Sequence, residues 1–143
     1  MTRKFVFPLV ERRYLESQFV GRLATASPKA VPHVAALCYA NDEGLVYINT
    51  DLDTKKGRNI EKNSRVAFIV DEYLSWEKNR GVIVLGGAKF TTKGIHFRKG
   101  RELIYSKYPK WEATWPMEED DRLGVDMISL TSLHHEASAC SSG

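Results

Sequence analysis

Apolar and polar residues alternate in several short segments of the chain, with the period expected of half-buried β-strands. FVGRLATAS alternates up to the turn Ser27-Pro28-Lys29, and RVAFIV is an apolar run short enough for a buried strand. Gly86 and Gly87 interrupt the longest segment, so a bulge, a bend or another backbone passing close is expected there. Six strands are predicted, at residues 19–27, 31–40, 45–49, 65–70, 81–92 and 125–133.

Three further segments have helical rather than alternating spacing, at residues 8–18, 54–62 and 95–108. Thr54 or Asp53 can cap the second helix at its start, and Asn63 is expected as a left-handed cap at its end. Three strands are consecutive and have hairpin-type connections such as Asn41-Asp42-Glu43-Gly44, which favours an antiparallel arrangement. The predicted fold class is therefore α+β dominated by β, with an antiparallel barrel and short peripheral helices in one domain over residues 1–143.

Composition narrows the class of protein without identifying it. The 143 residues are 43% apolar and 27% charged, and the net charge of +3 is below that of a dedicated nucleic-acid binder. Cys38 and Cys140 match no metal or redox spacing, which suits a reducing cytosol. No apolar run reaches membrane-spanning length, and the N-terminus does not have the pattern of a signal peptide. We therefore expect a cytoplasmic protein that binds neither nucleic acid nor membrane.

Positive charges stand at the wrong end of the second helix. Lys55, Lys56 and Arg58 follow a strand directly, where the helix macrodipole favours anions. One interpretation is solvated surface charge, partly offset by Asp51 and Asp53. The other is a bound phosphate, which accepts bonds from the free backbone N–H groups of a helix start and from lysines. A flat ligand attached to such a phosphate would rest on the neighbouring strand ends.

Motifs for other chemistries are absent. The sequence contains no GxxxxGK[ST], GxGxxG, HExxH or GxSxG pattern. His134 and His135 are adjacent in a predicted strand, so their rings would point to opposite faces. No metal site is predicted.

The stretch TKKGRNIEKNSRV resembles a pattern of the flavin-binding split β-barrel family, which includes the pyridoxamine 5′-phosphate oxidase-like proteins and their deazaflavin-using relatives. That pattern is a strand followed by [ST]-[KR]-K-x-x-N-[IL]-x-x-N-x-R-V. The matching residues are Thr54, Lys55, Lys56, Asn59, Ile60, Asn63, Arg65 and Val66. The likeness runs from about Leu9 to Thr92 and implies a six-stranded antiparallel split β-barrel with Greek-key order.

The resemblance also implies a homodimer with FMN at the subunit interface. By this likeness Thr54, Lys55 and Lys56 bind the phosphate, with Asn59 as a helper. The isoalloxazine ring would be lined by His33, Val34 and Ala35 on one strand and by Ile48, Asn49 and Thr50 on the next. The implied activity is an FMN-binding oxidoreductase for an unidentified small molecule, in which the flavin carries the chemistry. No catalytic side chain is identified.

Departures from the family pattern limit the substrate. His33 stands where pyridoxamine 5′-phosphate oxidases carry an arginine, and Asn79-Arg80-Gly81 replaces a glutamine often seen near the fifth strand. TSLHHEASACSSG lacks the Arg- and His-containing segment that holds pyridoxal phosphate in those enzymes, which disfavours vitamin B6 oxidation.

Several alternatives stay open. The chain can be a flavin carrier or redox sensor without turnover, or a relative that binds the deazaflavin F420 or haem. F420 would call for basic residues beyond the two lysines, such as Arg58. Haem would need one of the four imidazoles, at His33, His96, His134 and His135, as an axial ligand. The roles of Trp76, Trp111 and Trp115, as flavin or partner contacts or as packing residues, are also open.

Overall fold

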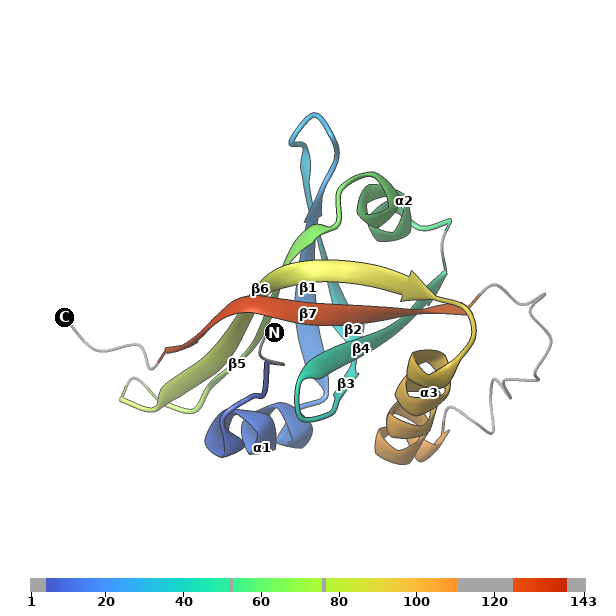
Figure 1. Cartoon of the computed structure of the whole chain (residues 1–143). Helices are drawn as coiled ribbons and strands as arrows, with labels where there is room; N and C mark the ends of the chain where they lie inside the picture. The colour runs from blue at the N-terminus through green and yellow to red at the C-terminus, as the bar shows by residue number, and fades with distance from the viewer. Residues whose placement is uncertain (1–4, 52, 76, 111–124, 139–143) are drawn as a thin grey trace.

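The computed structural model describes residues 5–51, 53–75, 77–110 and 125–138. Three helices and seven strands make up this part of the chain, in a curved sheet with helices at its ends (Figure 1). The helices are α1 (Leu9–Ser17), α2 (Lys55–Lys62) and α3 (Ile95–Lys107). The strands are β1 (Val20–Ala26), β2 (Pro32–Cys38), β3 (Ala40–Asn41), β4 (Leu45–Asp51), β5 (Arg65–Tyr73), β6 (Asn79–Thr91) and β7 (Val125–Ser138). The predicted α+β class dominated by β is confirmed.

The strand order is β2-β1-β5-β6-β7-β4-β3, and every pairing is antiparallel. This hydrogen-bonding pattern defines an open sheet with β2 and β3 at its edges. It does not show a closed barrel of six strands. The sheet curves so strongly that β2 nevertheless contacts β4. Its two edges therefore lie close to each other, although they are at opposite ends of the strand order (Figure 1).

The strand predicted over residues 31–40 is divided at Tyr39. The Tyr108 hydroxyl accepts the Tyr39 N–H at 3.2 Å and lies 2.9 Å from the Tyr39 carbonyl oxygen. Since this side chain occupies both backbone groups, Tyr39 cannot join a strand ladder. The chain leaves β2 at Cys38 and enters β3 at Ala40, which adds the seventh strand to the six that were predicted.

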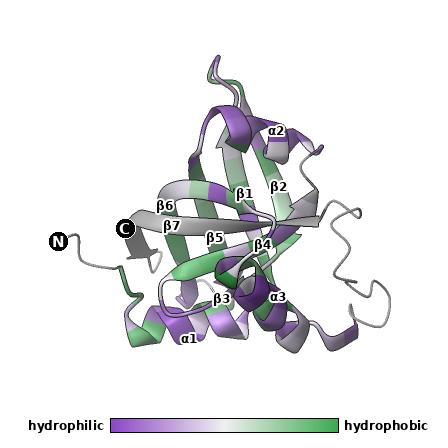
Figure 2. Ribbon diagram, turned by 45° about the vertical axis from the view of Figure 1, so that its right-hand side comes forward, coloured by the Kyte–Doolittle hydropathy of each residue, from purple (hydrophilic) through white to green (hydrophobic). Residues whose placement is uncertain are grey.

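Apolar side chains on the inner face of the sheet form the main core. Figure 2 shows the hydrophobic positions in green along the strands. Leu23, Ile48 and Phe68 contribute to it from three different strands and are fully buried. A second cluster lies under α3, where Ile104 packs with Tyr47 and Ala40. Burial of this size stabilises the fold by roughly 1.5–3 kcal/mol per large apolar side chain.

The local predictions have mixed outcomes. The pairing of β6 with β7 shifts between Leu85 and Gly86, so the irregularity expected beside Gly86-Gly87 is confirmed, although the extra residue, Leu133, lies on β7. The Thr54 cap is also confirmed, because its side chain accepts the Gly57 N–H. The left-handed cap at Asn63 is wrong: its backbone is extended, with φ −144°. Its side-chain oxygen accepts the Arg65 N–H instead, which leads the chain directly into β5.

Lys107 attaches the end of α3 to the body of the fold. Its ammonium group lies 3.9 Å from the centre of the Tyr39 ring and donates to the Leu15 carbonyl oxygen at 3.2 Å. Burial lowers the pKa of Lys107 to about 8, so the group still carries its charge at neutral pH. Cation–π attraction and this hydrogen bond together hold α3 against α1 and Tyr39.

Asp42 stabilises the predicted turn between β3 and β4. One carboxylate oxygen accepts the N–H groups of Gly44 and Leu45, and the other lies 3.0 Å from the Lys99 ammonium group. Burial acts to raise the pKa of Asp42, but the bonds from Gly44 and Lys99 outweigh it and hold this pKa below its ordinary value.

We expect Asp42→Asn to remove part of the acid sensitivity of the fold. A carboxylate with a lowered folded pKa contributes stability above its unfolded pKa of about 3.9, and this contribution is lost as the pH falls below it. At pH 7 the substitution should cost about 1–3 kcal/mol. Urea unfolding between pH 3 and pH 7 measures both effects. Glu61→Gln, at an exposed position of α2, is the control and should keep the wild-type profile; identical profiles for Asp42→Asn and the wild type would contradict the assignment.

Candidate functional site

The N-terminus of α2 carries two lysines that have no anionic partner among the described residues. Lys55 is exposed and Lys56 is half-buried, in the first turn of the helix. Thr54 uses its side-chain oxygen to accept the Gly57 N–H at 3.2 Å. The backbone N–H groups of Lys55 and Lys56 belong to the first turn, so no carbonyl within the helix can accept them. The first turn of α2 therefore combines two positive side chains with two unpaired helix-end donors.

Arg58 is not part of this free charge. Its guanidinium group donates to the Asp53 carbonyl oxygen at 2.7 Å and lies 3.4 Å from the Asp53 carboxylate. The interpretation of the basic run as plain surface charge offset by aspartates therefore applies to Arg58. The two lysines are left as the cations available to an anion.

Asn59 has a structural role. Its side chain is buried, and its amide nitrogen donates to the Thr25 hydroxyl at 3.0 Å. This bond ties α2 to β1 and engages the group that sequence reasoning assigned as a phosphate helper. Thr25 itself was missed. The signal available for it was a polar residue at an inward position of the alternating segment FVGRLATAS.

The two strand segments predicted to line the cofactor lie on β2 and β4, where the two ends of the curved sheet approach each other. We call this place the opening. His33, Val34 and Ala35 belong to β2, which pairs only with β1 among the described strands. Ile48, Asn49 and Thr50 belong to β4, and they lie beyond Tyr47, the last residue of β4 that pairs with β3. Both segments thus present unpaired backbone toward the opening. The helix α2, whose first turn contains the lysines, packs on β1 and β2 and follows β4 in the chain, so it lies at this end of the sheet (Figure 1).

These six residues differ in whether their side chains point into the core or outward. Ile48 and Thr50 point into the core, so they can offer a ligand only their backbone. Val34 points outward and is 66% exposed, whereas His33, Ala35 and Asn49 are half-buried. The predicted segments are brought together, but only part of each can present a side chain.

His33 and Asn49 each contain a polar atom without a partner. The His33 Nδ1 and the Asn49 Oδ1 are shielded from solvent and form no hydrogen bond with any described residue. Such atoms cost about 1–3 kcal/mol each when left unpaired, and buried polar groups are usually satisfied. One stands on each edge of the opening, which fits a ligand with hydrogen-bonding groups along its rim. A flavin is such a ligand, so the residues present fit this cofactor.

The other residues raised by the sequence are placed as follows. His96 is exposed on α3, and none of the described His, Cys, Asp and Glu side chains gather in a group of three that could hold a metal ion. His134 and His135 lie on β7 opposite Leu85 and Val84. Trp76, Trp111 and Trp115 lie outside the described residues. Among the described helices, none is long and apolar enough to cross a membrane.

Comparison with known proteins agrees with this architecture. The family model of pyridoxamine 5′-phosphate oxidase matches residues 10–134, most of the chain, so this chain belongs to that family. It is 31% identical over 134 residues to the 5a,11a-dehydrotetracycline/5a,11a-dehydrooxytetracycline reductase of Streptomyces rimosus, with 88% of this chain and 94% of the relative covered.

Solved structures share the fold at low sequence identity. An FAD-binding protein from Mesorhizobium loti superposes with a TM-score of 0.70 at 22% identity, covering 93% of this chain and 95% of its own. An F420 reductase gives 0.66 at 23% identity, covering 91% and 98%. A haem-binding protein from Mycobacterium smegmatis gives 0.71 at 15% identity, covering 94% of this chain and 59% of its own. Structures of this fold therefore include proteins named for three different cofactors.

Proposed function

We propose that this protein is an FMN-binding oxidoreductase that acts on a small molecule. The observation that carries the proposal is the pair Lys55 and Lys56, which stand at a helix N-terminus with no anionic partner among the described residues. A phosphate monoester is the anion that such a combination binds best. The reductase named above, at 31% identity, supports redox chemistry in this part of the family.

The chain's own residues would bind and orient the cofactor. Lys55 and Lys56 would hold the phosphate, with the Thr54 hydroxyl beside it. The backbone of Ala35 and Ile48 would border the ring, and His33 and Asn49 would each gain a hydrogen bond that they lack. When bound, FMN supplies hydride or electron transfer at its ring. None of these side chains is placed as a proton donor to a substrate, so no catalytic residue is assigned.

A homodimer with the cofactor at its interface is part of the proposal. The strand pairing puts Val34, Ala24 and Ala67 in one row on the outer face of the sheet, and Leu85 continues that row on β6. Val34 is 66% exposed and Leu85 is 40% exposed. A contiguous apolar strip of this kind fits a self-complementary contact beside the opening of a split barrel. Light scattering should give twice the mass of the 16.2 kDa chain.

The test of the proposed function is a titration followed by visible absorption. Purified protein, stripped of any bound chromophore, is mixed separately with FMN, F420 and haem. We expect saturable binding of FMN, with reduction of the bound flavin by dithionite and its reoxidation by a small-molecule acceptor. Binding of F420 or haem in preference to FMN would overturn the cofactor assignment. Tight FMN binding without turnover of any acceptor would favour the alternative, a flavin carrier or redox sensor.

A further inference from the structure

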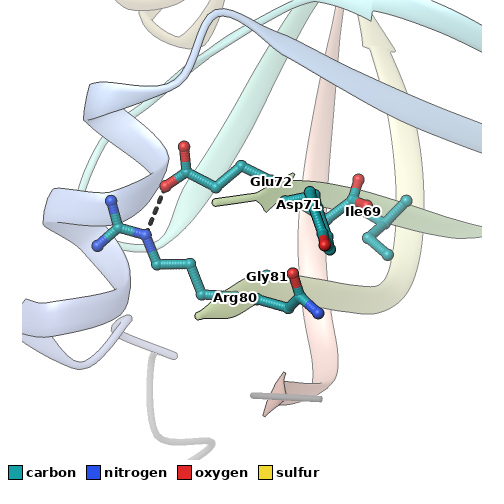
Figure 3. A pocket seen from close by; sticks show the side chains of 7 residues that line it. Ile69, Asp71, Glu72, Arg80 and Gly81 are labelled. Carbon is teal, nitrogen blue, oxygen red and sulfur yellow. Dashed lines mark hydrogen bonds and ion pairs between the residues drawn. The ribbon is translucent and has the colours of Figure 1, made fainter. Parts of the chain in front are cut away.

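A hollow of about 290 Å³ lies at the β5–β6 hairpin, away from α2 (Figure 3). Residues of both strands line it: Ile69, Asp71, Glu72, Tyr73, Asn79, Arg80 and Gly81. Its volume is close to the lower limit for small-molecule sites. The opening between β2 and β4 contains none of these residues.

Within the lining of the hollow, a glycine stands opposite a carboxylate. In the β5–β6 register Asp71 pairs with Gly81, and Tyr73 pairs with Asn79 next to them. A Cβ atom on Gly81 would lie 3.0 Å from the Asp71 Cβ and 3.1 Å from the Val70 carbonyl oxygen, so a side chain there would crowd its neighbours. Gly81 therefore lets the two strands pack closely here, and Ile69 and Tyr73 supply the apolar part of the lining.

The charged residues that line the hollow take part in two separate ion pairs. Glu72 and Arg80 form an ion pair (Figure 3). Arg80 also lies over the Tyr14 ring of α1. Asp71 uses one carboxylate oxygen to accept from Arg22 at 2.8 Å, and its side chain is 51% exposed. The second oxygen of Asp71 is therefore the anionic acceptor that remains for a ligand.

Asn79 supplies a second acceptor. Its side-chain oxygen is shielded from solvent and has no hydrogen-bond partner among the described residues. Asn79 also belongs to the lining of the hollow, so a ligand N–H group that reaches this oxygen would supply the missing partner. The available lining thus combines two acceptors, an aliphatic wall and an exposed aromatic ring. These features select a cation with several N–H donors on an apolar body.

We propose that this hollow is a second binding site, for a small molecule that carries an amidinium, guanidinium or ammonium group on a flat apolar frame. The charged group would donate to Asp71 and Asn79, and the frame would lie against Ile69 and Tyr73. The proposal does not depend on the cofactor at α2, since the two sites share no residue.

Benzamidine is the probe, and benzoate, which has the same shape and the opposite charge, is its control. Titrated into the full chain and followed by amide chemical shifts, benzamidine should give saturable shifts at Ile69 and Gly81 with a Kd on the order of 1 mM. Benzoate should give none there. No saturable shift with benzamidine, or equal shifts with both compounds, would overturn the proposal.

Two substitutions distinguish the role of the Asp71 carboxylate from that of its ion pair with Arg22. Asp71→Asn should weaken benzamidine at least tenfold, whereas Arg22→Gln removes the same ion pair but frees the carboxylate, so binding should be retained or strengthened. Asn79→Leu should also weaken binding while the far-ultraviolet circular dichroism stays unchanged. Equal losses in Asp71→Asn and Arg22→Gln would mean that only the geometry of the hairpin matters and would overturn the assignment.

Discussion

Replacing Lys55 and Lys56 together by alanine should weaken FMN binding by about 100-fold or more, because each charge-assisted bond to phosphate contributes roughly 1.5–3 kcal/mol. Riboflavin, which has the same ring and no phosphate, should bind the wild type and the double variant equally. Fluorescence quenching of the two flavins on titration with protein measures both affinities. The ratio of FMN to riboflavin affinity is the decisive quantity, since it isolates the phosphate from the ring.

Lys62→Ala is the matched control for this experiment. Lys62 is exposed in the last turn of the same helix, so its loss changes the net charge without touching the proposed phosphate site. Its FMN affinity should stay within about twofold of the wild type at 0.15 M salt, where charges more than about 8 Å apart are screened. A double variant that loses FMN and riboflavin equally would show that the lysines support the fold of the site and bind no phosphate.

Gly21→Ala should destabilise the protein by about 2–3 kcal/mol, as is typical of overpacking in a filled core. A Cβ on Gly21 would overlap the ring of Phe68 and would lie 3.3 Å from the Val70 Cγ2. Phe68 is fully buried, so its ring cannot turn into solvent to make room. Gly21 also pairs with Leu37 on β2, and a shift of this strand would widen the opening of the candidate site. Thermal or urea unfolding measures the loss.

Gly87→Ala provides the comparison within the same sheet. No heavy atom lies within 4 Å of the position that its Cβ would occupy, so the change should cost less than about 1 kcal/mol. Adding Phe68→Leu to Gly21→Ala should recover part of the loss, because residues in contact are energetically coupled. Equal costs at Gly21 and Gly87, or additive costs at Gly21 and Phe68, would contradict the proposed clash.

The elements were predictable because their signals are local. Alternation along VGRLATA and the helical pattern of KKGRNIEK depend on residues a few positions apart, and the Thr54 cap depends on the next three. The division of the second strand at Tyr39 was not predictable, because it depends on the hydroxyl of Tyr108, 69 residues away. The same holds for Asn59: the signature marks it as a site residue, and only contact with Thr25 shows that its amide holds α2 in place.

The features of the candidate site likewise include some that the sequence predicts and some that depend on the tertiary structure. The sequence alone determined the β-rich class, the two lysines at the start of α2 and the family resemblance, since each depends on residue types at short spacing. Tertiary structure decided that β2 and β4, at opposite parts of the strand order, border one opening, and that Ile48 and Thr50 face inward there. It also placed Gly81 opposite Asp71, among the residues that line the hollow at the hairpin. Sheet curvature and strand register arise from packing over the whole chain, and no short stretch of sequence contains them.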